Sequence, residues 1–147
     1  MFHENTRVEI GSEVEKMQFA NQVNGLVVKF IRTEVSAELD VELLVMERLI
    51  PLDYRAYEYE VRELWLDVFE DELKQLHEAG FVHRHLRRPS DMPGRLFDNV
   101  FLTETGVRLI DVGISSLASK VSDRLFKRFV DREWEEFEYF RKEFLSR

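Results

Sequence analysis

The sequence contains no cysteine, three prolines, six glycines and no long uninterrupted apolar run. The lack of cysteine excludes disulfides and thiol chemistry, and it leaves the redox compartment undecided. Because no apolar stretch is long enough to cross a bilayer, we expect no transmembrane helix. The polar N-terminus also lacks the apolar core of a signal peptide, so we expect a cytoplasmic protein.

Positive charge is also scarce, because 21 Lys and Arg residues face 29 Asp and Glu residues and give a formal net charge of −8. A general nucleic-acid binder needs a broad basic surface, so nucleic acid is an unlikely partner. Three arginines nevertheless lie close together in the sequence, at Arg84, Arg87 and Arg88. They keep a localised phosphate contact open.

What the sequence does contain is apolar and aromatic material for a folded core. Its 147 residues are 44% hydrophobic and include 12 Phe, 4 Tyr and 2 Trp. This composition is typical of a globular protein and is unlike that of a disordered chain. The length predicts one domain, residues 1–147.

The N-terminal third shows patterns that predict strands followed by a helix. Alternation and β-branched residues predict strands over residues 6–10, 16–21 and 26–32, with the Asn24-Gly25 pair favouring a hairpin turn between the last two. Apolar residues at three- to four-residue spacing predict a helix over residues 34–49, with Ser36 as its N-cap.

The remainder of the chain is predicted to be mostly helical, with one small hairpin. A helix should end at Ala79 and be capped by Gly80, although residues 52–60 fit either a strand or its first turns. Short strands are expected over residues 100–103 and 107–110. After Gly113 a helix carries an aromatic stripe that we interpret as core, or alternatively as a surface for a protein partner or homodimer, formed by Phe126, Val130, Trp134, Phe137, Phe140 and Phe144.

One segment carries candidate chemistry, and it runs from His83-Arg84-His85-Leu86 through Asn99 to Asp111-Val112-Gly113. The oxygens of Asn99 and Asp111 suit Mg²⁺, a hard ion that keeps several waters. The hairpin between these two residues should bring them to one side of a cleft. A metal pair of His83 with His85 is disfavoured because no further ligand cluster accompanies it.

In order and spacing this segment resembles the catalytic loop and metal-binding turn of eukaryotic-type protein kinases. The resemblance implies that His83 packs under the loop. The resemblance implies an α+β, kinase-like fold, with a small β-rich N-lobe part over residues 1–51 and a reduced helical C-lobe part over residues 52–147. It also implies ATP and Mg²⁺ as cofactors, with Asn99 and Asp111 as the metal ligands.

The same resemblance assigns roles in binding the nucleotide. Gly11 would lie at the entry to the loop that covers the phosphates, and Lys29 would be the strand lysine that contacts them. Glu42 would be the helix residue that pairs with this lysine, with Glu38 as the weaker candidate. Arg87 would make a further phosphate contact, bidentate where kinases place a lysine.

Departures from the kinase pattern weaken the expectation of catalysis. His85 stands where a kinase has its catalytic Asp, and the base could instead be Asp98 or Asp91. Glu13 stands where a second phosphate-loop glycine is expected, and the loop between His85 and Asn99 is longer than in the pattern.

We therefore expect a degenerate kinase-like protein that binds ATP and Mg²⁺ with weak or no phosphotransfer. One alternative is an active atypical phosphotransferase on a protein or small-molecule substrate. The other is a kinase-like interaction module that binds no nucleotide.

Overall fold

The computed structural model describes the backbone of residues 2–87 and 97–146, and the side chains of residues 11–87 and 97–146. The helices are α1 (Phe2–Val23), α2 (Tyr59–Ala79) and α3 (Asp123–Phe144), with the 3-10 turns η1 (Tyr54–Ala56) and η2 (Ala118–Lys120). The strands are β1 (Phe30–Ser36), β2 (Val41–Met46), β3 (Phe81–Val82), β4 (Val100–Thr103), β5 (Gly106–Leu109) and β6 (Ser116–Leu117).

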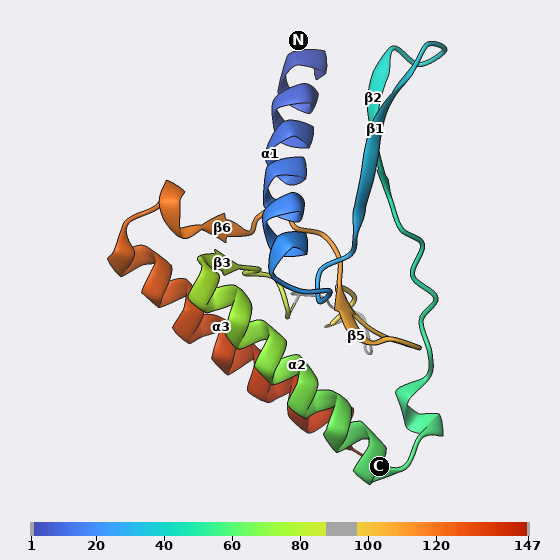
Figure 1. Cartoon of the computed structure of the whole chain (residues 1–147), viewed down its shortest axis with the longest axis vertical. Coiled ribbons are helices and arrows are strands. Elements are labelled where there is room, and N and C mark those ends of the chain that lie inside the picture. Colours follow the sequence, from blue (N-terminus) through green and yellow to red (C-terminus); the bar gives the residue numbers. More distant parts are fainter. Residues whose placement is uncertain (1, 88–96, 147) are drawn as a thin grey trace.

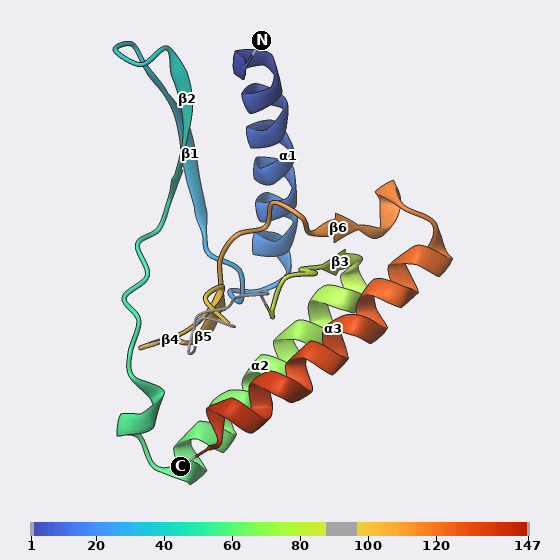
Figure 2. The same ribbon diagram turned by 180° about the vertical axis from the view of Figure 1, so that it is seen from behind.

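The described chain is an α+β protein in which every sheet is a two-stranded antiparallel pair, namely β1–β2, β3–β6 and β4–β5. Figures 1 and 2 show α2 and α3 running side by side in opposite directions, with α1 standing apart beside the long β1–β2 hairpin. The small β4–β5 hairpin lies between these two parts. The α+β class expected from the sequence is therefore confirmed.

Aromatic side chains fill the contact between α2 and α3. The ring of Phe69 on α2 meets those of Phe137 and Phe140 at centroid distances of 5.2 and 5.5 Å, and Phe140 stacks on Phe144 at 5.3 Å. All four side chains are buried. Of the predicted stripe on the last helix, Phe137, Phe140 and Phe144 are thus core, whereas Phe126, Val130 and Trp134 are half-buried.

Specific contacts fix both ends of α2. Gly80 follows α2 with φ 106°, a conformation that favours glycine, and its N–H reaches the carbonyls of Leu76 and His77. At the other end, the buried Arg62 donates from Nη1 to the carbonyls of Phe144 and Ser146, at 3.0 and 2.8 Å. The predicted cap at Gly80 is confirmed, and the helix that it ends begins at Tyr59.

The strands predicted over residues 6–10 and 16–21 are wrong, because both segments belong to α1. Met17 and Ala20 are buried and Phe19 packs against the core. The apolar positions of this segment therefore fit the spacing of a helix as well as the alternation of a strand. The Asn24-Gly25 pair ends this helix and forms no hairpin. Instead, Asn24 Nδ2 donates to the carbonyl of Glu72 at 3.0 Å and ties the end of α1 to α2.

The helix predicted over residues 34–49 is also wrong, because this segment forms most of the β1–β2 hairpin. Its turn is closed by Asp40 in a left-handed conformation (φ 50°), and Ser36 Oγ accepts the N–H of Leu39 at 3.3 Å. Ser36 therefore caps a hairpin turn where we expected it to cap a helix. Antiparallel pairing satisfies the backbone of these β-branched residues without a helix.

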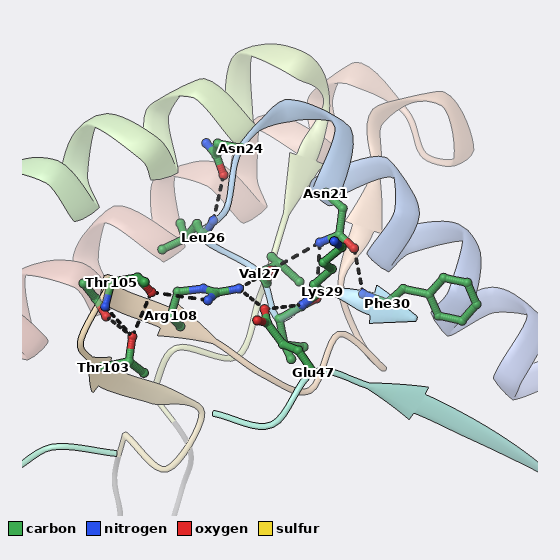
Figure 3. Close-up of polar contacts among 12 residues, drawn as sticks. Asn21, Asn24, Leu26, Val27, Lys29, Phe30, Glu47, Thr103, Thr105 and Arg108 are labelled. Carbon is green, nitrogen blue, oxygen red and sulfur yellow. Dashed lines mark hydrogen bonds and ion pairs between the residues drawn. The ribbon is translucent and has the colours of Figure 1, made fainter. Parts of the chain in front are cut away.

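A polar cluster joins the start of this hairpin to β5, as Figure 3 shows. Glu47 Oε1 accepts the N–H of Lys29 at 2.8 Å and also the guanidinium of Arg108. Burial alone would raise the pKa of Glu47, but these two donors outweigh it and hold the pKa below its usual range. Alongside, the buried segment 26–28 pairs with Leu109. Of the predicted strand 26–32, only residues 30–32 belong to β1.

Candidate functional site

The carboxylate of Glu133 on α3 binds the backbone of the loop that starts at His83. This side chain is 0% exposed, and it accepts the backbone N–H groups of His83 at 3.2 Å and Arg84 at 2.7 Å. The ring Nε2 of His77 on α2 lies 2.6 Å from the same carboxylate. One buried anion therefore fixes the loop against two helices.

His83 belongs to the core and does not face a ligand. Its side chain is fully buried, with Nε2 2.8 Å from the carbonyl of Ile110 and Nδ1 accepting the N–H of His85 at 3.2 Å. This pattern requires the neutral ring with its proton on Nε2. Burial also lowers the pKa of His83, which agrees with a neutral ring. His83 is thus a positioning residue, as expected from the sequence.

His85 has its backbone fixed on both sides while its side chain is half-exposed. Its N–H is bound by the ring of His83, and its carbonyl accepts Nδ2 of the buried Asn99 at 3.1 Å. The imidazole at the position expected for the base is therefore presented from a rigid segment. Asp98, the second base candidate, lies next to Asn99 and is also half-exposed.

The two candidate metal ligands lie at the open end of the β4–β5 hairpin. The N–H of Ile110 donates to the carbonyl of Asn99 at 3.0 Å, so Asp111 follows directly on the strand beside Asn99. Asp111 has φ 59°, and its Oδ1 accepts the N–H of Gly113 at 3.2 Å. This left-handed turn holds the exposed Asp111 carboxylate against the backbone of Gly113, while the amide of the buried Asn99 faces His85.

This pair is a sparse ligand set. Among the described residues there is no group of three or more His, Cys, Asp or Glu side chains that could hold a metal ion. Mg²⁺ is commonly bound through one or two protein oxygens together with waters and substrate phosphates. Asn99 and Asp111 alone therefore do not form a permanent protein cage for a metal ion.

The residues expected to cradle the nucleotide are not brought together. Gly11 lies inside α1, so it opens no phosphate loop, and Glu42 lies on β2, where it pairs with Val35. Lys29 is opposite Glu47, which lies five residues beyond Glu42 along the chain. At about 3.3 Å per residue the hairpin separates Lys29 from Glu42 by roughly 16 Å, so the expected ion pair does not form.

Arg87 contributes to the end of the loop, although not as a free phosphate ligand. Its guanidinium lies 4.6 Å from the ring centroid of Tyr139, and its backbone N–H binds the carboxylate of Glu136. A cation held over an aromatic face is already partly satisfied. Asp91 and Arg88 lie outside the described residues.

On the other side of the Asp111–Gly113 turn, a cavity of about 540 Å³ is bordered by three cations. Lys16 Nζ donates to the carbonyl of Gly113 at 3.0 Å, and Lys120 Nζ lies 3.7 Å from Glu15. Arg84 Nη1 donates to the carbonyl of Ile114 and to Ser116 Oγ, both at 3.1 Å, while its guanidinium covers Phe129. These cations are thus anchored to the turn and its surroundings.

The sequence does not single out Glu133 or Lys16, because each lies in a charged stretch of the kind that is usually exposed to solvent. No family model matches this chain, and no curated protein matches it either. Within the described residues no helix has the length and apolar character needed to cross a bilayer. The site therefore has to be interpreted from its own geometry.

Replacing Glu133 with Ala should destabilise the whole protein. The change leaves the buried N–H groups of His83 and Arg84 without their acceptor, which typically costs about 3–5 kcal/mol when a buried charged partner is removed. Urea unfolding should show this loss, whereas Glu135→Ala on the exposed face of α3 should leave stability nearly unchanged. Equal stability of the two variants would contradict the role given to Glu133.

Glu136 should make stability depend on pH. Burial, followed by repulsion from Glu133, raises the pKa of Glu136 from 4.5 to about 7. The unfolded chain releases this proton at lower pH than the native state, so native stability falls as pH rises from about 4.5 to about 7. The loss should be roughly 2 kcal/mol after allowance for partial solvation.

The neutral substitution Glu136→Gln should remove this dependence. We expect the variant to match the wild type near pH 4.5 and to melt at a higher temperature at pH 8, since roughly 2 kcal/mol corresponds to several degrees in a chain of this size. Thermal unfolding at a series of pH values measures the difference. A Glu135→Gln control should show no such difference from the wild type, and a Glu136→Gln variant that melts with the wild type at both pH values would refute the shift.

Proposed function

We propose that this chain is a degenerate kinase-like protein that binds ATP together with Mg²⁺ and transfers phosphate weakly or not at all. The observation that supports the proposal is the backbone bond between Asn99 and Ile110, which brings the chain at Asp111 to the open end of the β4–β5 hairpin, and the bond from Asn99 to the fixed loop at His85. Phosphoryl transfer depends mainly on positioning and on neutralising phosphate charge. The described residues supply part of that apparatus.

Nucleotide binding should be weak because the positive side of the cradle is not assembled. Lys29 does not meet Glu42, and Gly11 is helical, so neither can hold the phosphates in the expected way. Each lost charge-assisted contact to phosphate removes about 1.5–3 kcal/mol of binding free energy. We therefore expect an affinity in the millimolar range, and Asp111 is the residue that would hold Mg²⁺.

Weak or absent transfer follows from the base position. His85 replaces a carboxylate, and a general base in the right place contributes about 10²–10⁴-fold to the rate. An imidazole can accept a proton near neutral pH, so an active atypical phosphotransferase remains the alternative enzyme. In that case the base would be His85 or Asp98.

A second candidate function is a kinase-like interaction module that binds no nucleotide. Two observations favour it, namely the unassembled cradle and the apolar side chains exposed along the β1–β2 hairpin. Val35 and Leu39 are 74% and 69% exposed. Surface apolar residues gathered on one element typically mark a contact site.

A thermal-shift titration distinguishes nucleotide binding from the interaction module. Millimolar ATP with Mg²⁺ should raise the melting temperature of the wild type by one to a few degrees, because a ligand that binds only the native state stabilises it by about RT ln(1 + [L]/Kd). Asp111→Asn should lose the Mg²⁺-dependent part of this shift. The control Asp67→Asn, on the exposed face of α2, should keep it.

Absence of any shift in the wild type at millimolar nucleotide would refute the proposal and favour the interaction module. A Mg²⁺-dependent shift that survives in Asp111→Asn would refute the metal assignment alone.

Turnover of labelled ATP tests whether His85 acts as a base. The proposal expects the wild type and His85→Ala to share the same low residual rate, because the rest of the catalytic apparatus is incomplete. Asp98→Asn should behave in the same way. A fall of ten-fold or more in either variant would identify an active enzyme with that residue as its base.

A further inference from the structure

The outer edge of strand β1 is not paired with any described strand, although α1 packs beside the hairpin. β1 pairs only with β2, and its five central residues, 31–35, are all exposed. Among the described residues, the backbone groups of this segment form hydrogen bonds only within the β1–β2 pair. The free edge is therefore a row of unpaired N–H and C=O groups, which is a template for another strand.

The side chains along this edge are self-complementary about Thr33. When two copies of β1 lie antiparallel with Thr33 opposite Thr33, Arg32 faces Glu34 of the other copy and Ile31 faces Val35 of the other copy. Cation then meets anion and apolar meets apolar, on both sides of a two-fold axis. Within one chain, Arg32 and Glu34 are already 2.6 Å apart, with side chains 59% and 47% exposed.

Alternative registers of the same pairing are disfavoured. Only every second residue of β1 directs its backbone groups outward, so two copies can shift relative to each other only in steps that keep this alternation. Centring the axis on Arg32 places arginine opposite arginine, and centring it on Glu34 places glutamate opposite glutamate. Like charges directly opposite each other are destabilising, so the axis through Thr33 is selected.

Edge charges often serve to prevent strand pairing, and β1 also has an irregularity between Phe30 and Arg32 that would twist its edge. Edge charges prevent two copies of a strand from pairing when charges of the same sign face each other. Here the two charges have opposite signs and lie at equal distances from Thr33, so they attract a second copy. The irregularity falls at Ile31, which faces no residue of β2, whereas residues 32–36 keep a regular register. The contact about Thr33 therefore depends chiefly on the two Arg32–Glu34 pairs.

We propose that the chain forms a symmetric dimer in which the β1 edges of two copies pair antiparallel about Thr33. The two hairpins then become one four-stranded sheet, and the exposed Ile31 and Val35 are partly covered. A lone two-stranded hairpin is marginal in water, whereas a sheet of three or more strands with an apolar face is stable. The dimer does not require nucleotide binding.

Charge reversal and charge exchange test the contact through the mass in solution. Sedimentation equilibrium of the wild type from about 10 to 200 µM should show a monomer–dimer equilibrium. Arg32→Glu and Glu34→Arg should each weaken dimerisation at least ten-fold, because each places like charges opposite each other. The double variant Arg32→Glu/Glu34→Arg should restore the dimer, since it exchanges the charges and keeps the pairing.

The exposed Glu63→Arg on α2 is the matched control and should dimerise like the wild type. A wild type that stays monomeric across this range, or single variants that dimerise as tightly as the wild type, would overturn the proposal. Failure of the double variant to recover would also overturn it. A monomeric chain that binds another protein through the hairpin counts against it in the same way.

The lack of cysteine allows a direct test of the register. In an antiparallel pair, residues opposite each other have Cα atoms about 4.5–5.5 Å apart, within the range that a disulfide spans. Thr33→Cys should therefore give a covalent dimer under mild oxidation, while Lys74→Cys on the exposed side of α2 should stay monomeric. Equal cross-linking of both variants, or none in Thr33→Cys at concentrations where the dimer forms, would contradict the predicted axis.

Discussion

The buried carboxylate of Glu133 is the constraint on which the candidate site depends. A charge with no exposed surface is costly unless hydrogen bonds replace its water, and here the backbone of His83 and Arg84 and the ring of His77 replace it. These donors come from α2 and from the loop that follows Gly80, while the acceptor comes from α3. The anion therefore needs both helices and the loop together, and it fixes their relative positions.

From that anchor a chain of hydrogen bonds reaches the candidate metal ligands. His83 binds the carbonyl of Ile110, Ile110 binds Asn99, and Asn99 binds His85, so the loop and the β4–β5 hairpin position each other. The neighbouring Glu136 is held at a raised pKa largely by burial and by this same anion. The loop is thus maintained at a local cost in stability, which is a common feature of functional sites.

The sequence was sufficient for the C-terminal half and misleading for the N-terminal third. Helix α2, its cap at Gly80 and the β4–β5 hairpin follow from periodicity and glycine, and the backbone bond between Asn99 and Ile110 forms because that hairpin is local. Residues 34–49 failed because Val35, Leu39 and Leu43 fall at helical spacing yet are exposed on a hairpin. Their spacing reflects no buried helical face, and period alone cannot show burial. Glu133 could not be found in advance, since only the tertiary fold turns it inward.

The α2–α3 pair and the β1–β2 hairpin differ in how far their polar groups and apolar side chains are covered within the chain. Around Glu133 the backbone N–H groups of His83 and Arg84 are satisfied within the chain, although Nδ1 of His77 has no partner among the described residues. Aromatic rings from both helices fill the space between them. The β1–β2 hairpin instead leaves apolar side chains exposed and the outer edge of β1 unpaired, although it is tied to β5 through Glu47 and Arg108. Proteins protect such an edge with repulsive charge, a bulge or a covering element, or they pair it with another strand. Because Arg32 and Glu34 attract rather than repel a second copy, pairing is the outcome that the charges of β1 favour.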